Sequence, residues 1–446
     1  MKFNQVNIKN IYEEDKKIKA NFFLSDGYSF KNILRQRSSN TLSDLTESIS
    51  NIGVNNRYYV KNRNYGVPFV SNTNLSNASP MENIKYVSRK RCFNASRLIE
   101  KEMLLFSAIG TIGEVNFATD EMEGAMTPIG NIIRVKFKNK SGFYYAFFKS
   151  KYGRSVINQL GSGSVQTYLD PTTFSKVQIP IFDNFFVEKI HNLIVDAAAL
   201  RVEANKLLRE AVEVFDVFNE EYISGGFVTK KISINKVSVQ NKRFDANYNV
   251  VSSIVEDKLR GVKYFKISEL ADSIFMGPRS KRNYVANGVP FLSTSEMQKL
   301  NPTKTEKYIS EKNAGGFYVK KGWLLTTRSG TLGDTIFTFP VIDNYAVSED
   351  AIRIVIKDDS ALSNKYVFAF LKSNIGRNSL VSGSYGSVIL HLNEDFIGDI
   401  KVPVLQDKIE FVERNVSVYV SNMNEAIIKE NQAIDLIEKE IDQWQQ

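Results

Sequence analysis

The clearest pattern in the sequence is an apolar residue at every seventh position near the middle of the chain. No Gly or Pro occurs between Glu188 and Tyr222, so a continuous helix of about 35 residues, roughly 50 Å long, is allowed. One apolar row on it contains Ile190, Ala197, Ala204, Ala211 and Phe218, and the row beside it contains Leu193, Leu200, Leu207 and Val214. The pattern predicts a long helix with a helical partner.

The C-terminal segment repeats this pattern. One row contains Val420, Ile427, Ile434 and Ile441, and the other contains Val416, Met423, Ile437 and Trp444, with Glu430 interrupting it. Such stripes usually face the core of a domain, but each of these outlasts the typical helix of a globular protein. We therefore expect an antiparallel helix pair with a domain at each end, with Leu193, Leu200, Leu207, Val214, Val420, Ile427, Ile434 and Ile441 mediating helix pairing or partner docking.

Shorter patterns surround these helices. The β-branched, partly alternating runs 132–137 and 351–356 are typical of half-buried strands, and each precedes a helical segment, 142–159 or 363–380. Gly- and Ser-rich turns then lead into Ile179-Pro180-Ile181 or Val402-Pro403-Val404. The predicted fold class is α+β.

The matching segments belong to a long internal repeat. Gly66-Val67-Pro68-Phe69 returns as Gly288-Val289-Pro290-Phe291, and Gly110-Thr111-Ile112-Gly113 returns as Gly330-Thr331-Leu332-Gly333, with offsets between 219 and 226 residues throughout. A chain of 446 residues fits two such domains. We predict a first domain at 1–183, a long helix and hinge at 184–225, a second domain at 226–404 and a second long helix at 405–446.

Charge separates the domains from the helices. Residues 184–222 carry a net charge of −4 and residues 405–446 one of −5, while the whole chain carries +9, which leaves +18 on the remainder. The repeated domains are therefore expected to contact a polyanion, and the acidic helices a protein.

Several classes of protein are disfavoured. Cys92 is the only cysteine, and the two histidines, His191 and His391, lie 200 residues apart, so an internal disulfide and a thiolate or histidine-rich metal site are not expected. No apolar run is long enough for a membrane span and the N-terminus does not resemble a signal peptide, so we expect a cytoplasmic protein.

Catalytic motifs are not evident. The Gly-Thr-Ile/Leu-Gly segments lack the Gly-Lys-Ser/Thr of a P-loop and the third glycine of a dinucleotide fingerprint, so they are interpreted as tight turns. Glu256-Asp257-Lys258 resembles a nuclease element only weakly and has no counterpart in the first half. We expect no catalytic residue, no metal and no cofactor bound by this chain.

Side chains suited to DNA contact occupy corresponding loops of the two halves. Arg and Asn can recognise guanine and adenine, while Lys, Ser and Thr mostly hold phosphates. Solvated loop residues are the alternative interpretation at each position. The candidates are Arg57, Lys61, Arg63, Asn64, Ser71, Asn72 and Asn74 in the first half, and Arg279, Lys281, Arg282, Asn283, Ser293, Thr294, Ser295 and Arg328 in the second.

The duplicated order of these motifs, each set followed by a long helix, resembles the specificity (S) subunits of type I restriction-modification systems. The resemblance implies two target recognition domains that read the halves of a split DNA sequence, separated by an antiparallel coiled coil. It also implies double-stranded DNA and two modification (methyltransferase) subunits as partners, with or without restriction subunits. S-adenosylmethionine, and ATP and Mg for restriction, are then expected on the partner subunits.

Other functions stay open at this point. One is the DNA recognition subunit of a related restriction enzyme whose cleavage and methylation activities share another polypeptide. A second is an intrinsic nuclease or methyltransferase with an unrecognised site, and a third is a scaffold whose basic domains bind an acidic protein.

Overall fold

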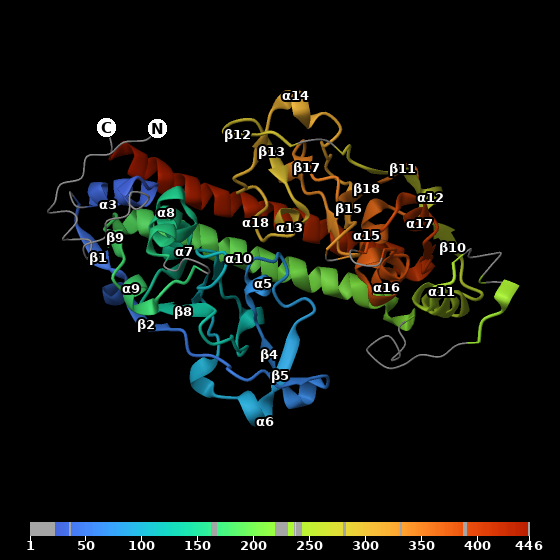
Figure 1. The fold of residues 1–446 in the computed structure, drawn as a ribbon, viewed down its shortest axis with the longest axis horizontal. Coiled ribbons are helices and arrows are strands. Elements are labelled where there is room, and N and C mark those ends of the chain that lie inside the picture. Colours follow the sequence, from blue (N-terminus) through green and yellow to red (C-terminus); the bar gives the residue numbers. More distant parts are fainter. Residues whose placement is uncertain are drawn as a thin grey trace. The chain divides into compact units, whose positions relative to one another are not determined.

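A computed structural model gives the fold of the chain in residues 23–34, 37–161, 167–218, 231–235, 237, 243–279, 282–330, 332–386 and 390–444 (Figure 1). The chain divides into two compact units. Unit 1 is Met1–Val202 with Glu425–Gln446, and unit 2 is Glu203–Asn424. Each unit thus combines one predicted recognition domain with parts of both long helices. The predicted division into 1–183, 184–225, 226–404 and 405–446 stays a prediction. The predicted hinge at 224–226 lies outside the described residues.

Unit 1 contains a four-stranded antiparallel sheet in the order β2-β8-β6-β7. Its strands are β2 (Thr46–Ser50), β6 (Leu104–Ser107), β7 (Val115–Phe117) and β8 (Ile132–Phe137). The expectation of a half-buried β8 is wrong, because five of its six residues are buried. Ile133 faces one apolar cluster and Ile132 faces another, so both faces of this inner strand are covered.

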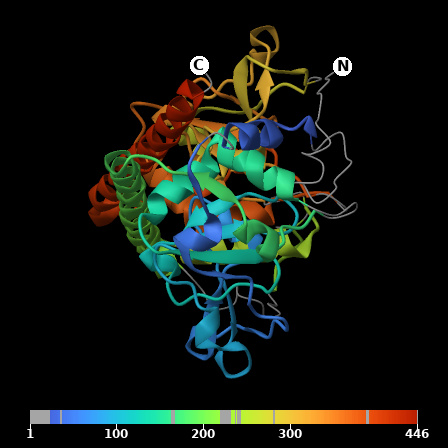
Figure 2. The same ribbon diagram turned by 90° about the vertical axis from the view of Figure 1, so that its left-hand side faces the viewer.

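Helices and a second, smaller sheet complete unit 1. The small sheet of unit 1 has the order β3-β5-β4 and lies at the end of the unit opposite α3 (Figures 1 and 2). Its strands are β3 (Tyr59–Val60), β4 (Gly66–Phe69) and β5 (Lys85–Ser88). The other elements are α3 (Asp26–Leu34), β1 (Ser39–Thr41), α4 (Leu42–Leu45), α5 (Asn72–Leu75), α6 (Arg89–Cys92), α7 (Ser141–Lys149), α8 (Lys151–Leu160), α9 (Pro171–Ser175) and β9 (Gln178–Pro180), which pairs with β1.

Unit 2 repeats this architecture. Its four-stranded sheet, β11-β18-β15-β16, is formed by β11 (Ala271–Met276), β15 (Leu324–Thr327), β16 (Thr335–Phe337) and β18 (Ala351–Ile356). The small sheet of unit 2, β12-β14-β13-β17, is formed by β12 (Tyr284–Val285), β13 (Val289–Leu292), β14 (Tyr308–Ile309) and β17 (Ala346–Val347). The remaining elements are α11 (Ala246–Lys258), β10 (Tyr264–Lys266), α12 (Ile267–Leu270), α13 (Thr294–Met297), α14 (Glu311–Ala314), α15 (Asn364–Lys372), α16 (Asn374–Ser382), α17 (Glu394–Gly398) and β19 (Lys401–Pro403). The predicted α+β class is confirmed in both units.

The helix predicted at 142–159 is two helices, α7 and α8, which meet at Ser150. The backbone of Ser150 is extended, and its side chain accepts a hydrogen bond from the Gly153 N–H at 3.2 Å. A Cβ on Gly153 would lie 2.2 Å from the Phe147 carbonyl oxygen, so this close turn requires glycine. Ser373 and Gly376 produce the same break between α15 and α16.

Both long helices are present, as α10 (Asn184–Glu213), which continues into the 3₁₀ turn Val214–Phe218, and α18 (Ile409–Gln443). The predicted row from Ile190 to Phe218 is buried along its whole length. The row from Leu193 to Val214 is only half-buried. The second buried row lies one residue further on, at Ile194, Arg201, Leu208 and Phe215.

The second buried row of α10 differs from the predicted one because a helical turn contains 3.6 residues. Counted from a residue i of the first row, position i+4 lies on the buried face here, and position i+3 lies at its edge. On α18, Ile427, Ile434 and Ile441 are buried as predicted, while Val420 is half-buried. Glu430, which interrupts the apolar row, is also fully buried.

In unit 1 the two helices pack against each other in opposite directions. The rings of Phe182 and Trp444 lie 5.1 Å apart, while Arg201, further along α10, contacts Glu430, which lies earlier in α18. Ile190, Ile194, Ile434 and Ile437 belong to one core cluster with α7 and α8. The segments of α10 and α18 within this unit therefore run in opposite directions.

A buried arginine in the central strand fixes the loops of each unit. Arg134 in β8 donates hydrogen bonds to the carbonyl oxygens of Ile52 at 2.7 Å and Leu98 at 3.1 Å. Arg353 in β18 is fully buried and donates to the carbonyl oxygens of Ser348 at 2.9 Å and Phe317 at 3.2 Å. Burial lowers the pKa of Arg353 to about 10, so the side chain remains a cation at neutral pH.

Candidate nucleic-acid interface

The small sheet of unit 1 presents its basic residues to solvent. Helix α6 is a single turn, closed by a hydrogen bond from the Phe93 N–H to the Arg89 carbonyl oxygen at 3.2 Å. Cys92 points inward among Val54, Val67, Phe69 and Val87, while Arg89, Lys90 and Arg91 are exposed. The apolar anchor thus turns three consecutive cations outward.

The predicted residues Arg57, Lys61, Arg63 and Asn64 are exposed on the same small sheet and its connections. Among the described residues, none of the cations Arg57, Lys61, Arg63, Arg89, Lys90 and Arg91 lies within ion-pair distance of a carboxylate. We call these six side chains the cationic face of unit 1. Residues 51–99 include eight basic side chains and one acidic one, so the segment carries a net charge of +7. An uncompensated cluster of this kind is suited to a phosphate backbone.

Aromatic rings lie between these cations. Tyr58, Tyr59, Tyr65 and Phe93 are exposed, with Tyr65 at 70%. The Arg91 guanidinium lies 4.6 Å from the Tyr58 ring centre, and Lys85 lies 5.5 Å from that of Tyr59. The rings hold the cations in place and offer flat surfaces to a ligand. The sequence-based prediction did not include α6 or these rings, although the run Arg89-Lys90-Arg91 was visible in the sequence.

The polar residues predicted after β4 mainly stabilise the local fold. The Ser71 hydroxyl donates to the Asn74 side-chain oxygen at 2.6 Å, and the Asn74 amide donates to the Pro80 carbonyl oxygen at 3.1 Å. The Asn72 amide donates to the carbonyl oxygen of Ile109, beside the glycine turn, at 3.2 Å. These three side chains are therefore already engaged in caps and loop contacts.

The glycine turns themselves are confirmed as tight turns. Gly110 and Gly113 have φ angles of +82° and +85°, and Gly330 and Gly333 have angles of +83° and +78°. A left-handed backbone of this kind favours glycine over any residue with a side chain. The two motifs are part of the shared framework.

In unit 2 the corresponding surface is partly neutralised. The Arg282 guanidinium donates to the Glu349 carboxylate at 2.7 Å and to the Ser348 hydroxyl at 3.1 Å, and it lies 5.2 Å from the Phe291 ring centre. Although burial opposes it, the hydrogen bond from Arg282 lowers the pKa of Glu349. Arg282 is thus held by an internal carboxylate.

The other candidates of unit 2 have different surroundings. Arg279 and Asn283 are exposed, and Lys281 lies outside the described residues. The Ser293 hydroxyl donates to the Glu296 carboxylate at 2.6 Å at the start of α13, while Thr294 is half-buried and Ser295 is exposed.

Arg328 is the least exposed of the predicted DNA contacts. Its side chain is 9% exposed, and its guanidinium lies 3.7 Å from the Asp350 carboxylate. The equivalent of Arg328 in unit 1 is Ala108. In both units the main-chain N–H of this residue donates to the carbonyl oxygen of the residue just before the central strand, Asn131 in unit 1 and Asp350 in unit 2, so its main chain belongs to the framework.

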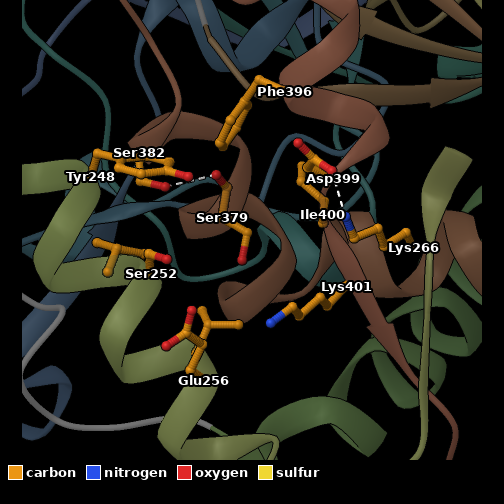
Figure 3. A pocket seen from close by; sticks show the side chains of 12 residues that line it. Tyr248, Ser252, Glu256, Lys266, Ser379, Ser382, Phe396, Asp399, Ile400 and Lys401 are labelled. Carbon is orange, nitrogen blue, oxygen red and sulfur yellow. Dashed lines mark hydrogen bonds and ion pairs between the residues drawn. The ribbon is translucent and has the colours of Figure 1, made fainter. Parts of the chain in front are cut away.

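Unit 2 also contains a small cavity of about 230 Å³ between α11, α16, α17 and β19 (Figure 3). Glu256 and Lys401 line it, and Lys266 forms an ion pair with Asp399 at 2.8 Å.

Two further observations concern the described residues only. They contain no group of three or more His, Cys, Asp and Glu side chains placed to hold a metal ion. None of their helices combines the length and the apolar character of a membrane span.

Part of unit 2 matches a known protein family. Residues 260–409 match the family model described as the type I restriction modification DNA specificity domain. A search of curated proteins found no match. The matched span lies within unit 2, and the same order of elements recurs in unit 1.

Solved structures that match this chain weakly include three from type I systems. The S subunit from M. genitalium has 12% identity and a TM-score of 0.29, with coverage of 91% of this chain and 94% of that one. The HsdS subunit from Thermoanaerobacter tengcongensis has 10% identity and a TM-score of 0.27, with coverage of 90% and 95%. A structure from a study of type I complex assembly and conformational transition has 12% identity and a TM-score of 0.29, with coverage of 92% and 96%.

The family match assigns residues 260–409 of this chain to the type I restriction modification DNA specificity domain. The TM-scores lie below 0.5, so this assignment rests on the family match. The resemblance to the specificity subunits of type I restriction-modification systems is confirmed through residues 260–409.

Proposed function

We propose that this chain is the non-catalytic, sequence-specific DNA-binding subunit of a type I restriction-modification complex, with unit 1 and unit 2 each recognising one half of a two-part target. The observation that carries the proposal is the duplication of one framework with different small sheets. Unit 1 presents six exposed cations with no carboxylate partner in the described part of the chain, whereas unit 2 neutralises Arg282 with Glu349. Equal frameworks with different surfaces suit two different half-sites.

In this proposal α10 and α18 form an antiparallel coiled coil that sets the distance between the half-sites. A helix of 35 residues, such as α18, is about 50 Å long, which exceeds the roughly 34 Å of one DNA turn. Exposed acidic side chains on these helices include Glu203, Glu213, Glu425 and Asp435. They disfavour contact with phosphates and leave these helices available to two modification subunits.

The methylation chemistry belongs to those partners. S-adenosylmethionine is bound by the modification subunits, and ATP and Mg by restriction subunits where the complex contains them. Since the substrate is cellular DNA, the assembly acts in the cytoplasm. This chain contributes the choice of sequence and the geometry.

The sharpest test exchanges residues 50–110 for the equivalent segment of another recognition domain and maps adenine methylation across a genome. One half of the methylated sequence is expected to change, while the other half and the spacing stay the same. A matched exchange of 272–330 should change the opposite half. An unchanged methylome, or one that is the same without this chain, would contradict the proposal.

A further inference from the structure

The packing of α10 against α18 in unit 1 includes a buried ion pair. Arg201 donates to the Glu430 carboxylate at 2.5 Å, and the side chains are 8% and 0% exposed. The fully buried Tyr145 of α7 lies beside this pair. The pKa of its hydroxyl is raised, mainly by burial and to a smaller extent by the negative charge of Glu430. We call Tyr145, Arg201 and Glu430 the polar trio.

The equivalent trio in unit 2 is apolar. The buried positions of α10 and α18 coincide at an offset of 222 residues, as Ile190 and Val412 show, and α7 and α15 correspond at an offset of 223. Arg201 therefore corresponds to Met423, Glu430 to Leu208 and Tyr145 to Phe368. All three residues of unit 2 are buried, at 1%, 5% and 1% exposure respectively. The repeat thus has an ion pair in one copy and none in the other.

This asymmetry affects which helices can pair. If α10 paired with α10 of a second copy in the same antiparallel manner, Leu208 would take the place of Glu430, and Arg201 would be buried without an anion. If α18 paired with α18 of a second copy, Met423 would take the place of Arg201, and Glu430 would be buried without a cation. A buried charge without its partner is strongly destabilising. Only the pairing of α10 with α18 satisfies both charges.

We infer that the polar trio is a partner-selecting contact, which allows α10 to pair with α18 and prevents either helix from pairing with its own kind in a second copy of the chain. In a duplicated protein the two long helices share the same pattern of buried positions. Without such a contact, α10 could pair with α10 of a second copy, and α18 with α18, as readily as α10 pairs with α18. Apolar residues fill the equivalent positions of unit 2, and replacing a buried ion pair by well-packed apolar residues is often neutral or stabilising. The ion pair therefore contributes discrimination rather than stability.

The test uses the full-length chain in a Cys92→Ala background with Ala204→Cys, which places the single cysteine near the twofold axis of any α10 self-pair. One variant, Tyr145→Phe/Arg201→Met/Glu430→Leu, gives unit 1 the apolar trio of unit 2. A second variant, Phe368→Tyr/Leu208→Glu/Met423→Arg, gives unit 2 the polar trio, so that self-pairs become complementary as well. Each protein is refolded from denaturant at increasing concentration. Light scattering then measures the dimer fraction, and oxidation measures disulfide-linked dimers.

Both variants are expected to give at least fivefold more disulfide-linked dimer than the parent chain, with the melting temperature of the first variant unchanged or higher. The charge-exchanged control, Arg201→Glu/Glu430→Arg, keeps the complementarity and should match the parent. Folded variants with no additional linked dimer would overturn the inference. An apolar variant that does not fold would also overturn it, because the pair would then support the fold rather than select the partner.

Discussion

The small sheets of the two units share three equivalent strands, but the cations on them have different surroundings. In unit 1, the turn after β5 is Arg89-Lys90-Arg91, and the segment 51–99 includes one acidic residue. In unit 2, the equivalent turn is Glu311-Lys312-Asn313, and the segment 277–319 includes three acidic residues among seven basic ones. The comparison teaches that the framework fixes where the surface is placed, while its charge varies freely. Two units of one fold can therefore present surfaces of different charge.

The largest expected effect concerns the shared framework, through Arg134→Met and Arg353→Met. Each substitution removes several hydrogen bonds from the arginine to carbonyl oxygens of the surrounding loops, so we expect the free energy of unfolding to fall by roughly 3 kcal/mol. Arg353→Met should have the larger effect, because Arg353 is completely buried. Urea denaturation measures the change, with the exposed Arg63→Met as the control. Equal stability of all three variants would show that these hydrogen bonds are dispensable.

The next effect separates the two surfaces. Replacing Arg89, Lys90 and Arg91 together by alanine should weaken DNA binding at every sequence and lower the slope of log K against log salt by about 3. The matched control is Lys312→Ala in α14. It removes one cation, so the slope of log K against log salt should change by about 1 at most. Fluorescence anisotropy at several salt concentrations gives both slopes. If α14 changed the slope as much as α6, the comparison between the units would fail.

The converse substitution sharpens the same comparison. Glu311→Arg/Asn313→Arg makes the turn of unit 2 similar to that of unit 1, and should raise the salt slope by about 2. The gain should be accompanied by a nearly unchanged melting temperature, since Glu311 is exposed and Asn313 is only half-buried. A higher slope with weaker discrimination between DNA sequences would show that the added contacts go to phosphates.

A smaller effect should appear in acid. Glu349 has a pKa below its usual 4.5 because Arg282 donates a hydrogen bond to it, although burial opposes the shift. A lowered folded-state pKa means that the stabilisation is complete above about pH 4.5 and is lost as the pH falls through the lower value. On acidification below about pH 4.5, the melting temperature of the Glu349→Gln variant should therefore fall less than that of the parent chain. A larger fall in melting temperature in the variant than in the parent chain would contradict a lowered pKa of Glu349 in the folded state.

The smallest effect is expected for Cys92→Ala. Alanine occupies the equivalent position in unit 2, Ala314, where it is fully buried. Loss of the thiol should cost about 1 kcal/mol or less and leave DNA affinity unchanged. A large loss of affinity would show that Cys92 positions the cations of α6 more strictly than its counterpart does in α14.

The sequence by itself determined the elements that depend on local periodicity and on backbone conformation. The buried row from Ile190 to Phe218 follows from the seven-residue repeat, and the turns at Gly110 and Gly330 follow from glycine's tolerance of positive φ. The repeat also revealed the duplication, because equivalent motifs occur in the same order. Local rules of this kind act within a few residues and can be recognised without the fold.

The tertiary structure decided which charges are buried and which are exposed. Glu430 looked like an interruption of an apolar row until Arg201 was found beside it, 229 residues away in the sequence. Arg282 and the cations of α6 are similar residues in similar loops. The carboxylate of Glu349 lies next to Arg282, whereas no carboxylate of the residues that the structure describes lies within ion-pair distance of the α6 cations. The free energy of a charge depends on its distance to partners and on its exposure to water, and both are properties of the folded chain.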